Sequence, residues 1–196
     1  CIRDSDTTTS ASTMAAYYLC NDHALQSDLA DELAGWPEEL SFEQVFHSTN
    51  GLICVFYETI RMHPPVPLFL RRTIRECQFG DVRVPPDTML CIPSSYIHRL
   101  PDWWARPDEF DPSRFSPEVN EHKKHNFMWV PFGGGAHKCI GMHFARMLIL
   151  LTFREVLGKY QLEFAEEGYY PAKLQHFPFT RPLDSLPVRL VVRQAS

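Results

Sequence analysis

One cysteine lies in a stretch suited to holding a cofactor: Cys139, within W-V-P-F-G-G-G-A-H-K-C-I-G-M-H-F-A-R at residues 129–146. Three consecutive glycines precede it, and glycine lets the backbone approach a bulky group because it has no Cβ. Nearby cations such as Lys138 and a following helix N-terminus both favour a thiolate, which is a nucleophile and a metal ligand. We therefore predict that Cys139 presents its sulfur to a cofactor. The alternative is a buried structural cysteine after a flexible loop.

The spacing around this cysteine is specific. It reads F-x-x-G-x-H-x-C-x-G and resembles the haem-ligand loop of the cytochromes P450, with its constrained positions at Phe132, Gly135, His137, Cys139 and Gly141. The resemblance implies that the Cys139 thiolate binds the iron of haem b and that Phe132 packs near the sulfur. It also implies that the loop glycines, Gly133 among them, lie against the cofactor and that His137 holds a haem propionate.

Two further motifs resemble the scaffold of the same family. Glu58 and Arg61 are three residues apart in an expected helix, so they share one face, although such a pair alone is usually a surface ion pair. Followed by M-H-P-P-V-P, the pair resembles the P450 signature in which both charges are buried. Buried charges need a further partner. The stretch R-P-D-E-F-D-P-S-R-F resembles the P450 element that supplies one, here Arg114.

An acid adjoins an alcohol near the start of the chain, in R-D-S-D-T-T-T. By resemblance to the P450 oxygen-activation helix, Asp6 and Thr7 are the catalytic pair that relays protons to bound dioxygen. The alternative is that Asp6 or Ser5 caps a helix N-terminus and the threonines are spacers. Arg3 and Asp4 depart from the family pattern, which usually has small residues beside the haem.

The segment P-L-F-L-R-R-T carries two adjacent arginines. The resemblance places Arg71 where a basic side chain grips a haem propionate, and a guanidinium suits a carboxylate well. Arg72 then points to the other face of the strand, toward solvent; the alternative is a strand register that exchanges the two arginines. Leu68 and Phe69 are expected either to line the pocket above the haem or to be ordinary core. We do not expect the nearby His98 to bind a metal.

These residues must be positioned by a mainly helical fold with small antiparallel sheets. We expect helices at the start of the chain, near residues 25–33, after the S-F-E-Q capping box, over residues 51–62, and over residues 142–157, where Gly158 is the stop signal. A hairpin turning at Gly80 and Asp81 is expected, together with strands at residues 160–164 and 188–192. By resemblance, H-F-P-F-T at residues 176–180 makes a turn into the substrate pocket.

Composition narrows the possible partners. The net charge is −5 with both signs mixed, so no nucleic-acid partner is expected. The six scattered cysteines are typical of free thiols in a reducing compartment. No apolar run reaches about 18 residues, so this segment gives no indication of a membrane span and we expect a cytoplasmic protein. A P450 membrane anchor would precede this segment.

The resemblance implies a function for the chain. P450 haem domains are much longer than 196 residues, so residues 1–196 are expected to form the C-terminal portion of one such domain. The implied activity is insertion of one atom of dioxygen into an apolar substrate, such as a sterol, terpenoid or fatty-acid-like molecule. A ferredoxin or flavoprotein reductase would supply electrons. Lys138 and Arg146 are expected either to meet acidic groups on this donor or to form an ordinary solvated face. The sequence most resembles bacterial P450s similar to sterol demethylases. The alternative is an inactive or truncated haem-binding fragment without turnover.

Overall fold

The computed structural model describes residues 2–46 and 50–193, with side chains from Asp6 onward. The structure is mainly helical with small two-stranded antiparallel sheets, which confirms the expected fold class. The helices are α1 (Ile2–Asn21), α2 (His23–Ala34), α3 (Phe42–Phe46), α4 (Gly51–Met62), α5 (Ser94–Ile97) and α6 (Met142–Lys159), with short 3-10 turns η1 (Pro112–Phe115), η2 (Glu121–Lys123) and η3 (Gly135–His137). The strands are β1 (Phe69–Arg72), β2 (Cys77–Phe79), β3 (Val82–Val84), β4 (Met89–Ile92), β5 (Tyr160–Phe164), β6 (Leu174–Gln175), β7 (Arg181–Pro182) and β8 (Val188–Val192).

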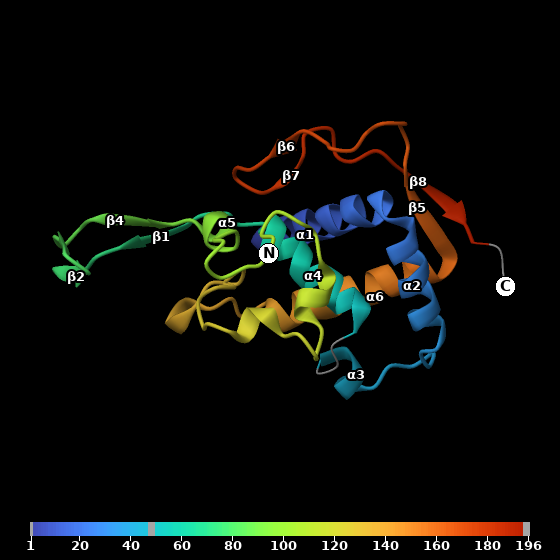
Figure 1. Ribbon diagram of the computed structural model, residues 1–196, viewed down its shortest axis with the longest axis horizontal. Helices are drawn as coiled ribbons and strands as arrows, with labels where there is room; N and C mark the ends of the chain where they lie inside the picture. Colours follow the sequence, from blue (N-terminus) through green and yellow to red (C-terminus); the bar gives the residue numbers. More distant parts are fainter. Residues whose placement is uncertain (1, 47–49, 194–196) are drawn as a thin grey trace.

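Helices α1, α2, α4 and α6 form the body of the molecule (Figure 1). Their apolar faces meet in one core, where side chains such as Leu19, Ile53, Phe56 and Leu150 are almost completely buried. Burying each such side chain contributes about 1.5–3 kcal/mol relative to leaving it in water. The core therefore fixes α1 and α6 on either side of α4.

Local sequence signals set the ends of the helices. Asp22 caps α2 through a 2.9 Å bond from the Leu25 amide, and Asn50 caps α4 through a 2.9 Å bond from the Ile53 amide. Helix α4 ends at Met62 because proline cannot continue a helix and disfavours helical backbone in the residue before it. The capping box opens α3 as expected, since Ser41 and Gln44 exchange side-chain to backbone bonds.

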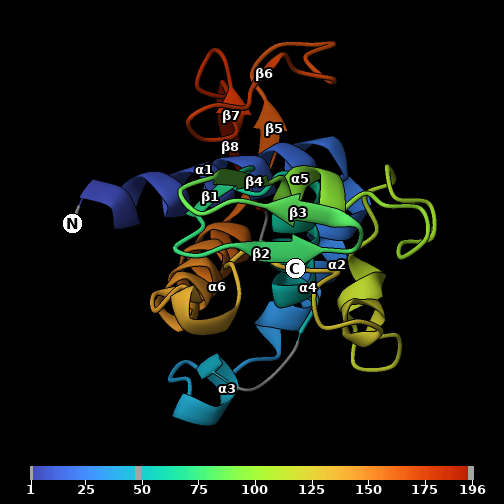
Figure 2. The same cartoon turned by 90° about the vertical axis from the view of Figure 1, so that its left-hand side faces the viewer.

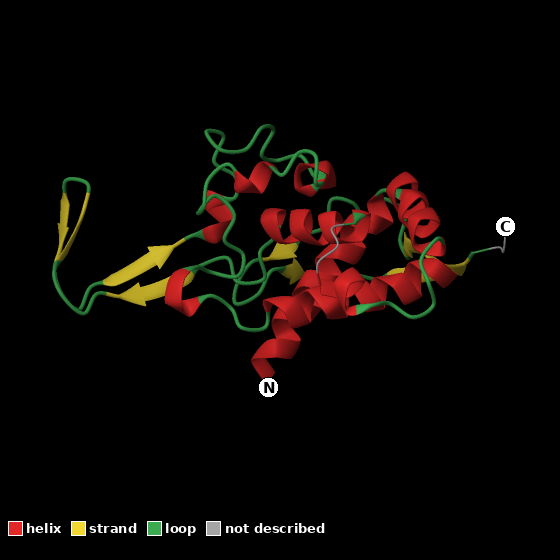
Figure 3. Ribbon diagram, turned by 90° about the horizontal axis from the view of Figure 1, so that it is seen from below, coloured by secondary structure: helices red, strands yellow, loops and turns green. Residues whose placement is uncertain are grey.

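Two small sheets form an arm that projects from the helical body (Figures 1 and 2). Strands β1 and β4 pair in antiparallel fashion, with Phe69 opposite Ile92. Strands β2 and β3 form the expected hairpin, whose turn begins at Gly80 with φ of +56°, a conformation that glycine adopts without strain. Viewed from below, the arm leaves the body at the end of the molecule opposite to the C-terminus (Figure 3).

The C-terminal part of the chain closes the other end of the body. Strands β5 and β8 pair as expected, with Tyr160 opposite Val192. The prediction that Gly158 ends the last helix is wrong, because α6 runs on to Lys159 and passes directly into β5. Gly158 has neither a left-handed backbone nor a close neighbour, so nothing local stops the helix there. Across the described ranges, no helix is long and apolar enough to cross a membrane.

Candidate functional site

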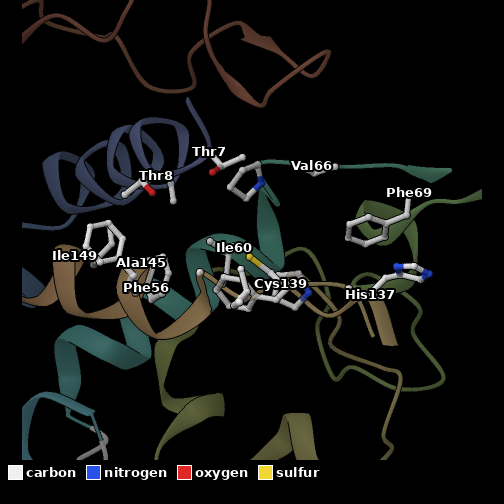
Figure 4. A pocket seen from close by; sticks show the side chains of 18 of the residues that line it. Thr7, Thr8, Phe56, Ile60, Val66, Phe69, His137, Cys139, Ala145 and Ile149 are labelled. Carbon is white, nitrogen blue, oxygen red and sulfur yellow. The ribbon is translucent and has the colours of Figure 1, made fainter. Parts of the chain in front are cut away.

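A cavity of about 430 Å³ lies between α1, α6 and the loop that precedes α6. Figure 4 shows Thr7 and Thr8 of α1 on one side and Cys139 facing them from the other side. Apolar side chains make most of the wall, among them Ala11, Phe56, Ile60, Val66, Phe69, Phe132 and Ile149. A pocket of this size, largely apolar with a few polar groups, is typical of cofactor and small-ligand sites.

The loop that carries Cys139 is built for a close approach. The Cys139 amide donates a 2.9 Å bond to the Phe132 carbonyl, which closes the loop on itself. Gly133 and Gly135 have φ of +70° and +64°, values that a residue with a Cβ adopts only with strain. A Cβ at Gly141 would lie 3.7 Å from the Cys139 sulfur, so glycine there leaves room beside the sulfur. Phe132, Gly133, Cys139 and Gly141 all line the cavity, whereas Gly135 supports the turn.

The α1 side of the cavity differs from the sequence expectation in one respect. Thr7 lines the cavity, but Asp6 is exposed and is not among its lining residues. Successive residues of a helix point about 100° apart, which separates the two side chains. Asp6 lies inside α1, which begins at Ile2, so the alternative that it caps this helix is wrong. The side chains of Arg3 and Asp4 lie outside the described residues.

Basic side chains lie at one end of the cavity. His137 and Arg71 both line it, and His137 lies near Phe69 in Figure 4. Arg72 points away, since it forms a 2.7 Å ion pair with exposed Asp87. The expectation that Leu68 lines the pocket is wrong: Leu68 is exposed, and only its neighbour Phe69 reaches the cavity. The expected pocket turn at residues 176–180 also does not line it.

A buried ionic network lies behind the cavity. Glu58 and Arg61 are fully buried and form a two-point ion pair, at 2.6 Å from Nε and 2.8 Å from Nη2 of Arg61. Arg114 lies 3.5 Å from the same carboxylate through its Nε. Burial raises the pKa of Glu58, and the hydrogen bond from Arg61 opposes that rise. The structure thus brings together the three residues that the motifs single out.

A fourth member of this network was not predicted from the sequence. Glu121 is only 4% exposed, and its carboxylate lies 2.9 Å from Nη1 of Arg114. The buried part of the network therefore holds two carboxylates and two guanidinium groups, and exposed Lys124 contacts Glu121 at 3.3 Å from outside. Arg61 also donates to the carbonyls of Pro107 and Glu109, so the bonds extend into the loop before η1. No sequence pattern singles out Glu121, since Glu118 lies nearer to Arg114 in the chain.

His98 is completely buried and both of its ring nitrogens are engaged. Nδ1 lies 3.2 Å from the Arg61 carbonyl, and Nε2 accepts a 2.9 Å bond from the Val130 amide. Neither nitrogen is therefore left for a metal ion. Burial lowers the pKa of His98 to about 3, and the nearby Arg61 and Arg99 cations act in the same direction.

Because His98 is buried, we expect the protein to lose folding stability in acid. Its pKa of about 3 when folded lies below the ordinary value of about 6.5, so the unfolded chain takes up the proton first. Between these values the free energy of unfolding falls by about 1.4 kcal/mol per pH unit, or about 2 kcal/mol from pH 7 to pH 5. Urea unfolding at the two pH values measures this. In His98→Gln, the free energy of unfolding should fall less between pH 7 and pH 5, because the buried imidazole is gone. An equal fall in the variant and the wild type would contradict the low pKa of His98.

The cations near Cys139 differ in exposure. Lys138 is exposed, but Arg146 is only 9% exposed and lies 3.4 Å from the Tyr57 hydroxyl. The expectation that Arg146 meets an acidic partner at the surface is therefore wrong. Tyr57 belongs to α4, so Arg146 connects α6 to α4 instead.

The residues around the cavity fit a haem. A single thiol faces a largely apolar space, Gly141 leaves room beside its sulfur, and two basic side chains are available for carboxylates. Among the described residues, no group of three or more His, Cys, Asp or Glu side chains lies together as a bare metal ion would need. A haem iron needs only one protein ligand on the Cys139 side of the cavity.

Comparisons with known proteins agree with this geometry. The profile of the cytochrome P450 family matches residues 5–186. A putative cytochrome P450 136 of Mycobacterium tuberculosis is 35% identical over 94% of this chain and 37% of its own length. Cytochrome P450 3A27 of Oncorhynchus mykiss is 30% identical over 95% of this chain and 36% of its own length.

The fold has a close counterpart among solved structures. Cyanobacterial CYP120A1 with bound retinoic acid superposes with a TM-score of 0.84 and 28% identity, covering 96% of this chain and 43% of that protein. This chain therefore spans about two-fifths of the length of the relatives it matches. Because the family profile covers nearly all of it, the chain belongs to the cytochrome P450 family.

Proposed function

We propose that residues 1–196 form the C-terminal portion of one haem domain in a haem-thiolate monooxygenase that oxidises an apolar organic molecule. The observation that carries the proposal is the placement of Cys139 opposite Thr7 across a largely apolar cavity. Family membership supports the same activity.

Cys139 is the proposed ligand of the haem iron, through its deprotonated sulfur. A thiolate in this position donates electron density to the iron, and the bound haem supplies binding and activation of dioxygen. The loop closure between Phe132 and Cys139 orients the sulfur toward the cavity. His137 and Arg71 would hold the haem carboxylates, since both line the same cavity and a guanidinium pairs well with a carboxylate.

Thr7 is the proposed proton-handling residue. Its side chain lines the cavity on the side opposite the sulfur, where its hydroxyl can hold a proton or a water molecule near bound dioxygen. Asp6 would stand at the outer end of this proton route and reach the cavity side of α1 only through water, because its carboxylate is exposed. Asp6 and Thr7 would thus act one after the other in delivering protons to the cavity.

The substrate class follows from the lining of the cavity. Its walls carry apolar side chains such as Ala11, Val66 and Phe69, which favour a hydrocarbon-rich molecule. The cyanobacterial relative holds retinoic acid, which is consistent with such a class. A ferredoxin or a flavoprotein reductase is the proposed electron donor, and exposed Lys138 would meet acidic groups on it.

Replacing Thr7 by alanine is expected to uncouple oxygen consumption from product formation. Without the hydroxyl, protons reach the wrong position or arrive late, so more of the reducing equivalents leave as hydrogen peroxide; general acid catalysis of this kind contributes roughly 100-fold or more. Peroxide released per reducing equivalent consumed measures the effect. Thr9→Ala is the matched control, because Thr9 is an exposed threonine of the same helix. If Thr7→Ala and Thr9→Ala release the same amount of peroxide per reducing equivalent, Thr7 does not take part in proton delivery.

Isotope incorporation tests the proposed activity itself. The haem-loaded protein is supplied with heavy-isotope dioxygen, an electron donor and a panel of apolar substrates, and products are analysed by mass spectrometry. The proposal expects one heavy oxygen atom in the product. Product oxygen that comes from water instead would exclude a monooxygenase.

A haem-binding protein without turnover is the second candidate. The exposure of Asp6 favours it, because the acid of the expected pair does not reach the cavity. This candidate expects stoichiometric haem binding with no labelled product from any member of the panel.

A further inference from the structure

His98 connects the buried ionic network to the loop that carries Cys139. On one side, its Nδ1 contacts the Arg61 carbonyl at 3.2 Å, and its own carbonyl accepts a 2.8 Å bond from Nη1 of Arg61. On the other side, its Nε2 accepts a 2.9 Å bond from the Val130 amide. The side chain is fully buried, so water does not compete for these bonds.

These contacts allow only one form of the imidazole ring. A carbonyl oxygen can only accept a hydrogen bond, so Nδ1 carries the proton and donates to Arg61. An amide N–H can only donate, so Nε2 is unprotonated where it meets Val130. Each ring nitrogen therefore has a distinct role, and a side chain that supplies only one of them would break the connection on the other side.

Val130 is in turn fixed to the cysteine loop. Its carbonyl accepts a 3.0 Å bond from the Gly133 amide, and the Phe132 carbonyl accepts the 2.9 Å bond from the Cys139 amide. Val130 is thus held on both sides of its Cα, by His98 at its amide and by Gly133 at its carbonyl. A continuous path of hydrogen bonds and backbone leads from Arg61 through His98 to the loop that closes on Cys139.

We propose that His98 is a positioning residue for the Cys139 loop, setting where the thiolate sulfur lies by holding the Val130 amide against the end of α4. Its effect on haem ligation rests on the proposed function of the site. Its hold on the loop does not, and it can be measured without haem.

Two substitutions of His98 distinguish the role of Nδ1 from that of Nε2. The amide of asparagine reaches the position of Nδ1 and can still donate to Arg61, but it cannot reach Val130. The amide oxygen of glutamine reaches the position of Nε2 and can still accept from Val130. His98→Asn and His98→Gln are therefore a matched pair, each of which removes one bond from the same buried position.

Amide hydrogen exchange of the unliganded chain is the first measurement. We expect His98→Asn to speed exchange at Val130 and at Cys139 by roughly fivefold or more, the size expected for one lost hydrogen bond, while His98→Gln leaves both close to wild type. Exchange at an amide of α2 serves as the internal reference for global stability. Faster exchange at Val130 with no change at Cys139 would overturn the proposal, and so would equal effects of the two variants.

The second measurement uses the haem-loaded chain. The Soret band of the ferrous carbon monoxide complex differs between thiolate and neutral thiol ligation, so it reports the protonation state of the ligating sulfur. We expect His98→Asn to convert part of the protein to the neutral-thiol form and His98→Gln to restore the wild-type band. If the Soret bands of His98→Asn and His98→Gln both match the wild type, His98 does not position the thiolate sulfur. If the wild-type chain itself lacks the thiolate band, the proposed function is contradicted. The hydrogen-exchange rates at Val130 and Cys139 then test by themselves whether His98 holds the loop.

Discussion

Serine at position 139 is expected to abolish thiolate ligation and to weaken haem binding by at least about 100-fold. Loss of an outer-shell partner alone lowers metal affinity by roughly 10- to 100-fold, and this change removes the proposed ligand itself. The hydroxyl of serine is far less acidic than a thiol and does not ionise near neutral pH. Titration of the chain with haem, followed by absorbance, measures the change.

Cys91→Ser is the matched control for this prediction. Cys91 is also an exposed thiol, but it lies on β4 in the projecting arm and does not line the cavity. Its replacement should leave haem affinity and the spectrum unchanged. Haem bound equally well by both variants would place the cofactor somewhere other than at Cys139.

Replacing Glu58 by glutamine is expected to destabilise the fold by about 3–5 kcal/mol, the usual effect of breaking a buried ion pair. Glutamine keeps the shape of the side chain but removes the charge that neutralises Arg61. That guanidinium is fully buried and cannot turn to water, so its charge remains uncompensated. Urea unfolding monitored by circular dichroism measures the loss, which is large compared with the total stability of most domains.

Glu155→Gln is the control for the ionic network. Glu155 forms a 2.8 Å ion pair with Lys159 on the surface of α6, where both side chains are two-thirds exposed. Such a pair is worth about 0.3–0.5 kcal/mol. A comparable loss in the two variants would mean that burial of the Glu58 charge does not matter to stability.

Local sequence signals were enough to predict most of the helices and strands. Proline after Met62, the capping box at Ser41 and the glycine turn at Gly80 each act through nearby backbone, so their effects can be derived without knowing the fold. The same reasoning failed at Gly158. Glycine only permits a helix to end, and here the chain continues in helical form until it pairs with β8.

Contacts between distant parts of the chain could not be predicted in this way. Arg146 is buried because Tyr57, 89 positions earlier, packs beside it, and Glu121 is buried because Arg114 and the Ala105 amide surround its carboxylate. The separation of Asp6 from Thr7 depends on how α1 is rotated against the cavity. The motif gives both residues, but packing of the helix decides which side chain faces inward.

The most direct test of the account is the spectrum of the ferrous carbon monoxide complex formed by the haem-loaded chain. We expect a Soret band at the long-wavelength position that a thiolate ligand produces, lost in Cys139→Ser and kept in Cys91→Ser. A band at the position of a neutral ligand in the unaltered chain, or one that survives replacement of Cys139, would contradict the assignment of Cys139 as the iron ligand.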